Sequence, residues 1–206
     1  MKYVYEELNF FDKSSKLLIG SRWPLDKMKI LDEIDIVFFE RPFMLIIGQE
    51  AFITIIEEFI RRIFYALKNE LLLDESCYNI GLVANQYDYV FWIEKNNDRS
   101  AFKHIRNTCW IGYEYKLFAY KSRISWLYND RYGNIVLEVT PWFNVYKCKD
   151  KAIYKQWIKN YKPILKRTIA PEIAQKWIKQ MEKLLNLIRV NSGIDSEYDF
   201  MNHSKK

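Results

Sequence analysis

The sequence predicts an α+β fold in which an antiparallel sheet packs against one long central helix, with two C-terminal helices. Residues 113–140 contain runs with an apolar period of two, which is typical of strands with one buried face. Residues 49–73 and 171–188 carry apolar side chains at spacings of three and four, which indicate amphipathic helices. Strand-like and helix-like segments do not alternate regularly, as a parallel doubly wound sheet would require.

The first part of the chain is expected to supply short strands. Residues 1–25 are mixed and contain Gly20, so we expect an irregular N-terminal segment with one short strand. Residues 34–39 and 43–47 are apolar runs separated by a proline, which fits a turn or a sheet edge. Gly48 follows the second run, and we expect it to end that strand.

The helix expected over residues 49–73 has a wide apolar stripe, which makes it the main core element. Glu57 precedes Arg61 and Glu58 precedes Arg62 by four residues on its polar side, in the order that favours ion pairs within a helix. Beyond this helix, residues 78–84 and 89–94 have a strand-like pattern, so two more strands are expected there.

A hairpin is expected where residues 124–128 and 135–139 each alternate between two faces. Residues 129–134 between them, NDRYGN, combine side chains that bond locally to backbone with a glycine that can take positive φ. Residues 113–119 predict one more strand before the hairpin. Pro141 cannot donate to a ladder, so it marks the place where pairing stops.

Two helices are predicted in the C-terminal part, over residues 150–161 and 171–188. A proline begins the second, a position where its missing N–H costs nothing, and Gly193 ends it. We therefore predict a single α+β domain over residues 1–193, followed by a flexible polar tail over residues 194–206.

Positive charge is concentrated in one part of the chain. The whole sequence has a formal net charge of +6, yet residues 141–190 hold twelve Lys and Arg against three Asp and Glu, a net charge of +9. Such asymmetry suits nucleic acid, an anionic membrane surface or an acidic protein partner.

Cysteine usage and hydropathy predict a cytoplasmic protein. The three cysteines, at 77, 109 and 148, are odd in number and far apart, which argues against a disulfide framework. The N-terminus lacks the apolar run of a signal peptide, and no uncharged stretch approaches the length of a membrane span. We expect no membrane association, and the oligomeric state stays open.

The sequence carries no strong catalytic motif, so we predict a non-enzymatic protein without cofactor or metal. Its six glycines stand singly, which removes the loops that bind phosphate groups through clustered glycines. Patterns of Cys and His with metal-ligand spacing are missing from the sequence. His104 and Cys109 are near enough in sequence for a nucleophile pair, but a surface imidazole beside a core thiol explains them more simply.

Buried carboxylates offer an enzymatic alternative. Glu138 lies among apolar strand residues and Asp88 lies between two tyrosines, so either carboxyl is a candidate acid or base. The structural interpretation of Glu138 is a salt bridge with a strand neighbour, for which Arg123 is the obvious candidate.

The basic residues 141–167 suggest a second alternative, a nucleic-acid-binding accessory protein. Lysines in this segment are interleaved with Tyr154 and Trp157, and lysine with aromatic residues can bind phosphates and stack on bases. Both aromatic residues, however, share the apolar face of the predicted helix, so we expect them in the core and the lysines in solvent.

Three segments together resemble the small immunity proteins that accompany bacterial polymorphic and contact-dependent growth-inhibition toxins. These are ERPFMLIIGQEAFITIIEEFI, WLYNDRYGNIVLEVTPWF and WIKNYKPILKRTIAPEIAQKWIKQMEKLLNLI. The resemblance covers residues 35–188: an aromatic-rich chain, an apolar strand pair that ends in Thr-Pro, and then a Trp-bearing C-terminal helix.

The resemblance implies a non-catalytic inhibitor that binds one cognate toxin domain, often a nuclease, and covers its active site. Complementary charge would guide that association. An acidic group near the start of the chain and a basic group on the penultimate helix are therefore the candidate partner-binding residues: Asp32, Glu33, Asp35, Glu40, Lys155, Lys159 and Lys162.

Overall fold

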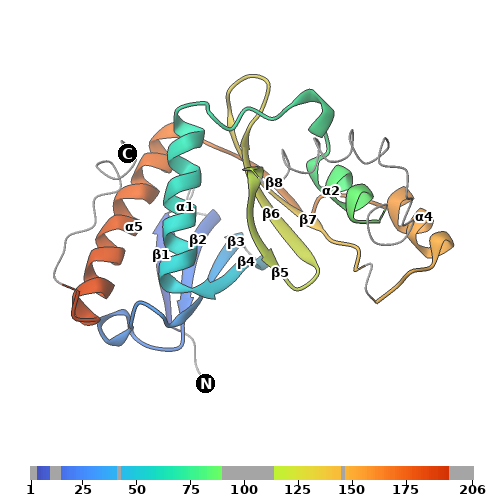
Figure 1. The fold of residues 1–206 in the computed structure, drawn as a ribbon. Helices are drawn as coiled ribbons and strands as arrows, with labels where there is room; N and C mark the ends of the chain where they lie inside the picture. The colour runs from blue at the N-terminus through green and yellow to red at the C-terminus, as the bar shows by residue number, and fades with distance from the viewer. Residues whose placement is uncertain (1–3, 10–14, 41–42, 90–113, 145–146, 195–206) are drawn as a thin grey trace. The chain divides into compact units, whose positions relative to one another are not determined.

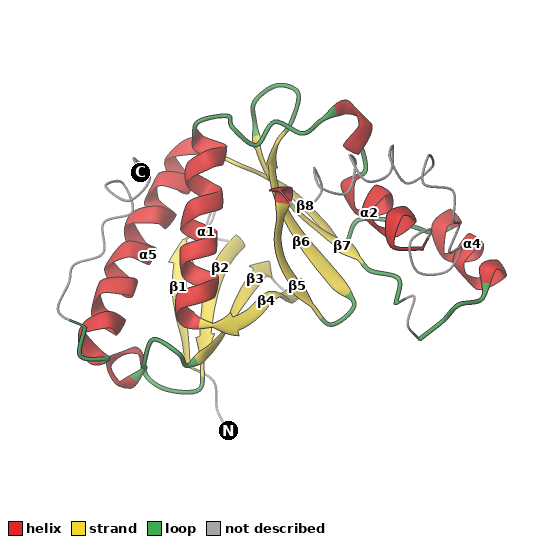
Figure 2. Cartoon of the chain, viewed as in Figure 1, coloured by secondary structure: helices red, strands yellow, loops and turns green. Residues whose placement is uncertain are grey.

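The computed structural model describes five stretches of the chain, residues 4–9, 15–40, 43–89, 114–144 and 147–194. They form an α+β structure with two four-stranded sheets and several helices, which confirms the predicted fold class (Figure 2). The one sheet of the sequence prediction is replaced by two. The chain divides into two compact units, and the single domain over residues 1–193 stays a prediction. Unit 1 takes its residues from 1–70 and 169–206, and unit 2 consists of residues 71–168.

Unit 1 contains an antiparallel meander in which each strand pairs with the next along the chain (Figure 1). Its strands are β1 (Val4–Asn9), β2 (Ser15–Ser21), β3 (Glu33–Glu40) and β4 (Phe43–Ala51).

Two expectations for this sheet were wrong. The N-terminal segment forms two regular strands, and Gly20 lies inside β2, opposite Asp35 on β3. Gly48 lies inside β4, where it pairs with Ile36 beside a shift in register, so the strand continues to Ala51. Both glycines accept an extended backbone within the ladder, and the rule that treats glycine as a strand end fails here.

Two helices contact this sheet within unit 1. Helix α1 (Phe52–Leu67) contacts β4, while α5 (Pro171–Asn191) contacts β1 and the short helix η1 (Leu25–Lys27). The two long helices also pack on each other, and the rings of Phe59 and Trp177 lie 5.8 Å apart between their centroids. Both of these aromatic side chains are fully buried, so they mark the centre of the unit 1 core.

Helix α1 is shorter than its apolar pattern predicts. It begins at Phe52 because β4 occupies the preceding residues, and it ends at Leu67, shortly before Asn69 takes a positive φ of 58°. The predicted ion pair between Glu58 and Arg62 is confirmed, with 2.6 Å between Oε1 and Nε. Arg61 contacts the same carboxylate.

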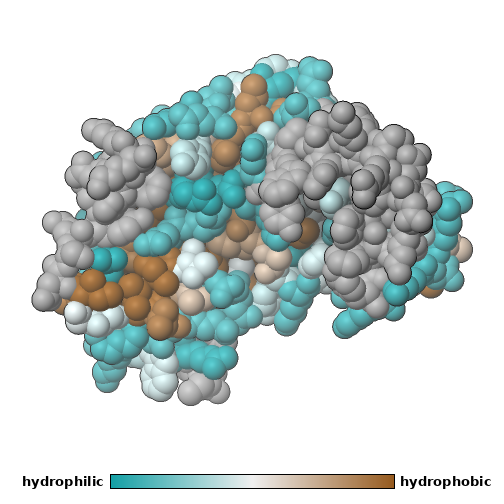
Figure 3. Space-filling model, viewed as in Figure 1, coloured by the Kyte–Doolittle hydropathy of each residue, from teal (hydrophilic) through white to brown (hydrophobic). Residues whose placement is uncertain are grey.

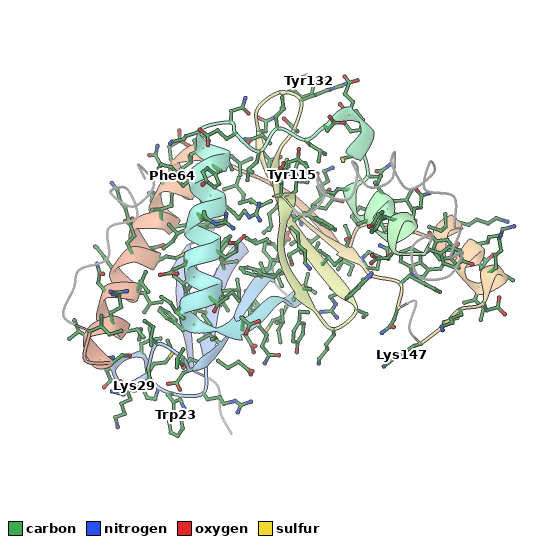
Figure 4. The ribbon with its side chains drawn as sticks, viewed as in Figure 1. Trp23, Lys29, Phe64, Tyr115, Tyr132 and Lys147 are labelled. Atoms are coloured by element: carbon green, nitrogen blue, oxygen red, sulfur yellow. The ribbon has the colours of Figure 1, made fainter. Side chains whose placement is uncertain are left out.

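Unit 2 is built around the predicted hairpin. Strands β6 (Arg123–Asn129) and β7 (Ile135–Pro141) pair in antiparallel register, with β5 (Lys116–Tyr120) on the other side of β6. The turn contains Gly133 at a φ of 81°, and Tyr132 lies at its tip (Figure 4). Pairing stops at Pro141, as the sequence predicts.

One predicted strand of unit 2 is instead the helix α2 (Ile80–Tyr89), which contacts β7. Residues 78–84 alternate in polarity like a strand, but the buried positions are Ile80, Gly81, Asn85 and Tyr89, which recur at helical spacing. Most of the second predicted strand, 89–94, lies outside the described residues.

The C-terminal part of the chain matches the predicted helices. Helix α4 (Lys151–Lys159) begins after Asp150, whose carboxylate accepts hydrogen bonds from the backbone N–H groups of Ala152 and Ile153 at 2.7 and 3.1 Å. The short strand β8 (Leu165–Ile169) lies beside β7 in the sheet and was not predicted. Helix α5 begins with Pro171, and Gly193 follows its end at a φ of 76°.

The described helices include no candidate for a membrane-spanning helix. None of them combines the length with the apolar character that a bilayer span requires.

Candidate partner-binding surface

The four acidic residues proposed from the sequence do not form one exposed acidic surface. Asp32 stabilises its own turn, because its Oδ2 accepts a hydrogen bond from the backbone N–H of Lys29 at 2.8 Å. Glu33 is exposed and accepts a hydrogen bond from the Gln49 side chain at 2.9 Å. Asp35 is only 4% exposed within β3, so its carboxyl is not open to a partner.

Glu40, the last of these residues, ends β3 and is half-buried. It lies seven residues beyond Glu33 on a strand, where successive side chains point to opposite faces of the sheet. The two carboxylates therefore belong to opposite faces and opposite ends of β3. The sequence places these acids together only because it does not reveal the direction of each side chain.

The lysines proposed from the sequence are all exposed, and two of them lie on α4. Lys155 and Lys159 are one helical turn apart on α4, and Lys151 lies one turn before them. All three side chains are exposed, and so is Lys162 just beyond the helix end. We call Lys151, Lys155 and Lys159 the lysine face of α4.

The opposite side of α4 is held by an aromatic cluster. Tyr154 stacks on Tyr89 with 3.7 Å between ring centroids, and Phe143 packs edge-on against Tyr154 at 5.1 Å. Trp157 lies 5.5 Å from Phe143 and 5.6 Å from Tyr161. These rings belong to the core of unit 2, as the apolar pattern predicts, so they fix the orientation of the helix and are not presented to a ligand.

Two apolar side chains in the segment that contains α4 are exposed. Ile153 on α4 is 54% exposed, and Ile164, just before β8, is 38% exposed. Ile153 is two residues from both Lys151 and Lys155, so it lies on the side of α4 that faces away from the lysine face.

Glu138, the first carboxylate candidate, is a buried link between strands. Its Oε2 accepts a hydrogen bond from the Tyr128 hydroxyl at 2.6 Å and lies 3.2 Å from the Lys166 ammonium. Arg123, the partner expected from the sequence, instead pairs in the ladder with Pro141, three residues along β7 from Glu138.

This carboxylate is closed to solvent. Glu138 is only 1% exposed, so a substrate cannot reach it in this conformation. Burial raises the pKa of the Tyr128 hydroxyl well above its ordinary value, and the neighbouring Glu138 carboxylate raises it further. Tyr128 is therefore a permanent hydrogen-bond donor to Glu138, which is a structural role.

Asp88, the second carboxylate candidate, connects α2 to the segment after β7. Its Oδ2 accepts a hydrogen bond from the indole N–H of Trp142 at 2.8 Å. Burial raises the pKa of Asp88, although the Trp142 hydrogen bond and the charge of Lys116 partly oppose this effect. A carboxyl of this kind can serve as an acid or base, but its observed contacts hold two segments together.

The remaining sequence candidates add no site. His104 and Cys109 lie outside the described residues. Within the described stretches, side chains of His, Cys, Asp and Glu do not gather in groups of three that could hold a metal ion. No protein-family model, curated protein or solved structure shows significant similarity to the chain.

Proposed function

We propose that the chain is a non-catalytic immunity protein that works in the cytoplasm by binding a cognate toxin domain, most simply a nuclease, and covering its active site. The observation that carries the proposal is the lysine face of α4. It is exposed, and the aromatic cluster on the buried side of α4 fixes its orientation. The resemblance of the sequence to immunity proteins supports the same function.

The charge of this face suggests how inhibition would work. Nucleases that use Mg²⁺ hold it with carboxylates and place it where the phosphate reacts. Such an active site is acidic when the metal is absent, so a row of ammonium groups is complementary to it. Lys155 and Lys159 would then occupy positions close to those of the metal, which excludes both metal and substrate.

A nucleic-acid-binding accessory protein is the second candidate, because Lys151, Lys155 and Lys159 can also contact phosphates. The position of the aromatic residues favours the protein partner. Tyr154 is only 7% exposed and stacks within the core, so it does not offer a platform for bases. Exposed Ile153 and Ile164 suit an apolar contact with a protein better than they suit a phosphate backbone.

The test is a pull-down from lysate of the source cells with the tagged full chain, washed at low and then at high salt. We expect one stoichiometric protein that survives the high-salt wash and whose nuclease activity the chain blocks. Nucleic acid that elutes as salt increases would support the second candidate instead, with an affinity that falls by roughly 0.7–0.9 logarithmic units per phosphate contact and per logarithmic unit of salt.

Charge reversal then tests the surface. We expect Lys155→Glu with Lys159→Glu to weaken inhibition on the order of 10- to 100-fold, since like charges would face each other across the interface. Lys147→Glu with Lys149→Glu is the matched control, because it makes the same charge change in the same segment outside α4. Equal inhibition by both double variants would show that the lysine face is not the contact surface.

A further inference from the structure

The side of α5 that faces away from the core is charged along most of the helix and apolar near its C-terminal end. Lys176, Lys179, Lys183, Leu187 and Val190 follow one another at steps of three or four, opposite the buried core side of the helix. Glu172 begins the same line in the first turn, where a negative charge favours the helix N-terminus. An amphipathic surface helix should be polar along this whole line. Instead, Leu187 is 44% exposed and Val190 is 67% exposed.

A third apolar side chain is exposed at the same end of unit 1. Leu31 is 76% exposed in the turn between η1 and β3. This turn is fixed to the end of α5, because the backbone N–H of Ile30 donates to Ser192 Oγ at 2.9 Å and Lys29 Nζ contacts the Asn191 carbonyl oxygen.

The start of α1 holds the other side of this turn. The backbone N–H of Ile53 donates to the carbonyl oxygen of Ile30 at 3.1 Å. Asn191 also donates from its side chain to the Leu25 carbonyl oxygen at 3.0 Å. A hydrophobic area covers the C-terminal end of α5 and the start of α1 (Figure 3), and Lys29 lies at the same end of the unit (Figure 4). The exposed apolar groups therefore stand on a rigid support.

We propose that this α5-end surface, defined by Leu31, Leu187, Val190, Lys179 and Lys183, binds an acidic amphipathic helix of a partner protein. Apolar side chains three and four residues apart form the ridge that a second helix packs against. Towards the start of α5, the same side of the helix carries Lys179 and Lys183. Their ammonium groups require Asp or Glu at the facing positions of the partner helix. The partner is therefore a helix with an apolar stripe at one end and acidic residues towards the other.

The charge pattern argues against a second copy of this chain as the occupant. In a parallel pair of α5 helices, Lys179 and Lys183 would face the same lysines of the other copy, which is unfavourable. In an antiparallel pair, these ammonium groups would cover Leu187 and Val190 of the other copy and lose hydration without gaining an anion. A partner helix with acidic groups at these positions complements both the lysines and the apolar side chains.

This surface goes beyond the proposed inhibitor function. It belongs to unit 1, whereas the lysine face of α4 belongs to unit 2. Failure of one proposal leaves the other intact, because the two surfaces are removed by different substitutions.

The experiment uses the full chain and a fluorescent synthetic helical peptide of about 18 residues, long enough to form a helix on contact. The peptide carries leucines at helical spacing in one half and glutamates at the same spacing in the other half, and a control peptide carries lysines in place of the glutamates. Fluorescence anisotropy is expected to show binding of the acidic peptide only. Leu187→Ser with Val190→Ser, and separately Lys179→Glu with Lys183→Glu, should each weaken it by about tenfold or more.

Two control variants make the surface assignment specific. Ile153→Ser removes a similarly exposed apolar side chain from α4, and Lys147→Glu with Lys149→Glu reverses two exposed charges outside both proposed surfaces, so both should leave peptide binding unchanged. All substituted side chains are exposed, and thermal unfolding of each variant should match that of the parent chain.

Several results would overturn the proposal. Equal binding of both peptides would show that charge plays no part, and equal losses from the two control variants would show that the peptide binds elsewhere. If the acidic peptide does not bind but vesicles of phosphatidylserine and phosphatidylcholine do, and Leu187→Ser with Val190→Ser abolishes that binding, the surface is a membrane contact. A dimer in sedimentation that the same double variant dissociates would assign the surface to a second copy.

Discussion

Glu138 connects three strands of unit 2 through a single carboxylate. Tyr128 on β6 donates to it at 2.6 Å, Lys166 on β8 lies 3.2 Å away, and the same ammonium lies over the Tyr128 ring. We expect Glu138→Gln to lower the free energy of unfolding by about 1–3 kcal/mol, since a buried charge-assisted network loses its charge. Chemical denaturation followed by tryptophan fluorescence measures this loss.

The exposed Glu70→Gln makes the same chemical change and should be nearly neutral in that measurement. The combined outcome separates a structural carboxylate from a catalytic one. An unchanged unfolding curve for Glu138→Gln, together with loss of some activity of the chain, would return Glu138 to the list of catalytic candidates.

Asp88 makes the stability of unit 2 depend on pH. Burial is the largest effect on its carboxyl and raises its pKa in the folded chain, so the ionised form is less favourable there than in the unfolded chain. The free energy of unfolding should therefore fall as pH rises from the ordinary aspartate pKa through the raised folded value. Above the folded-state pKa of Asp88, the free energy of unfolding has fallen by the full amount and no longer changes with pH.

Asp88→Asn removes this penalty and keeps an oxygen that can accept the Trp142 hydrogen bond. We expect the variant to be more stable than the parent chain at neutral pH, with the difference disappearing below the ordinary aspartate pKa. Urea denaturation of both proteins across this pH range measures the effect. A variant that is less stable at neutral pH would show that the hydrogen bond to the ionised carboxylate outweighs its burial.

Helix α2 is positioned by a glycine that allows close contact with β7. A Cβ added at Gly81 would lie 2.5 Å from the Thr140 side chain and would also collide with the Tyr161 hydroxyl. Gly81→Ala should therefore lower the free energy of unfolding by about 1–3 kcal/mol, even though alanine favours an isolated helix. Gln86→Ala changes an exposed position of the same helix and should be neutral or slightly stabilising, as judged by thermal unfolding. A stabilised Gly81→Ala would show that α2 can move away from β7 at no cost.

The same glycine explains why the sequence does not predict α2. Its buried side contains Gly81 and Asn85, which carry no apolar signal, while Ile80, Leu82 and Ala84 alternate like a strand. Asn85 is 1% exposed because it donates to the Pro141 carbonyl oxygen and accepts from the Phe143 backbone N–H. A polar residue used in this way is visible only once its tertiary partners are known.

Elements with local signals were predicted correctly. The hairpin has its turn residues, α4 has Asp150 at its start, and α5 lies between Pro171 and Gly193. The same distinction between local and tertiary signals applies to the candidate site. The exposed lysines of α4 follow from helical periodicity, whereas the burial of Asp35 depends on the strands and helices around β3, which its own neighbours in sequence do not reveal.

The chain as a whole contains two sheets, each with its own buried residues. Phe59 is fully buried against Trp177 in unit 1, and Leu137 is fully buried in β7 of unit 2. Unit 1 is discontinuous in sequence, since α5 joins it only after unit 2 has been completed. The formation of α1–α5 contacts therefore depends on residues more than one hundred positions apart, which local sequence patterns do not report.

This division predicts separate responses to core substitutions. Phe59→Ala should destabilise unit 1 by about 3–5 kcal/mol and Leu137→Ala should destabilise unit 2 by about 2–5 kcal/mol, because each leaves a cavity. Native-state hydrogen exchange measured by mass spectrometry should show faster exchange in α1, α5 and β2–β4 for the first variant and in β6 and β7 for the second. If either substitution accelerates exchange in both sheets equally, the chain unfolds as one cooperative domain, the organisation predicted from the sequence over residues 1–193.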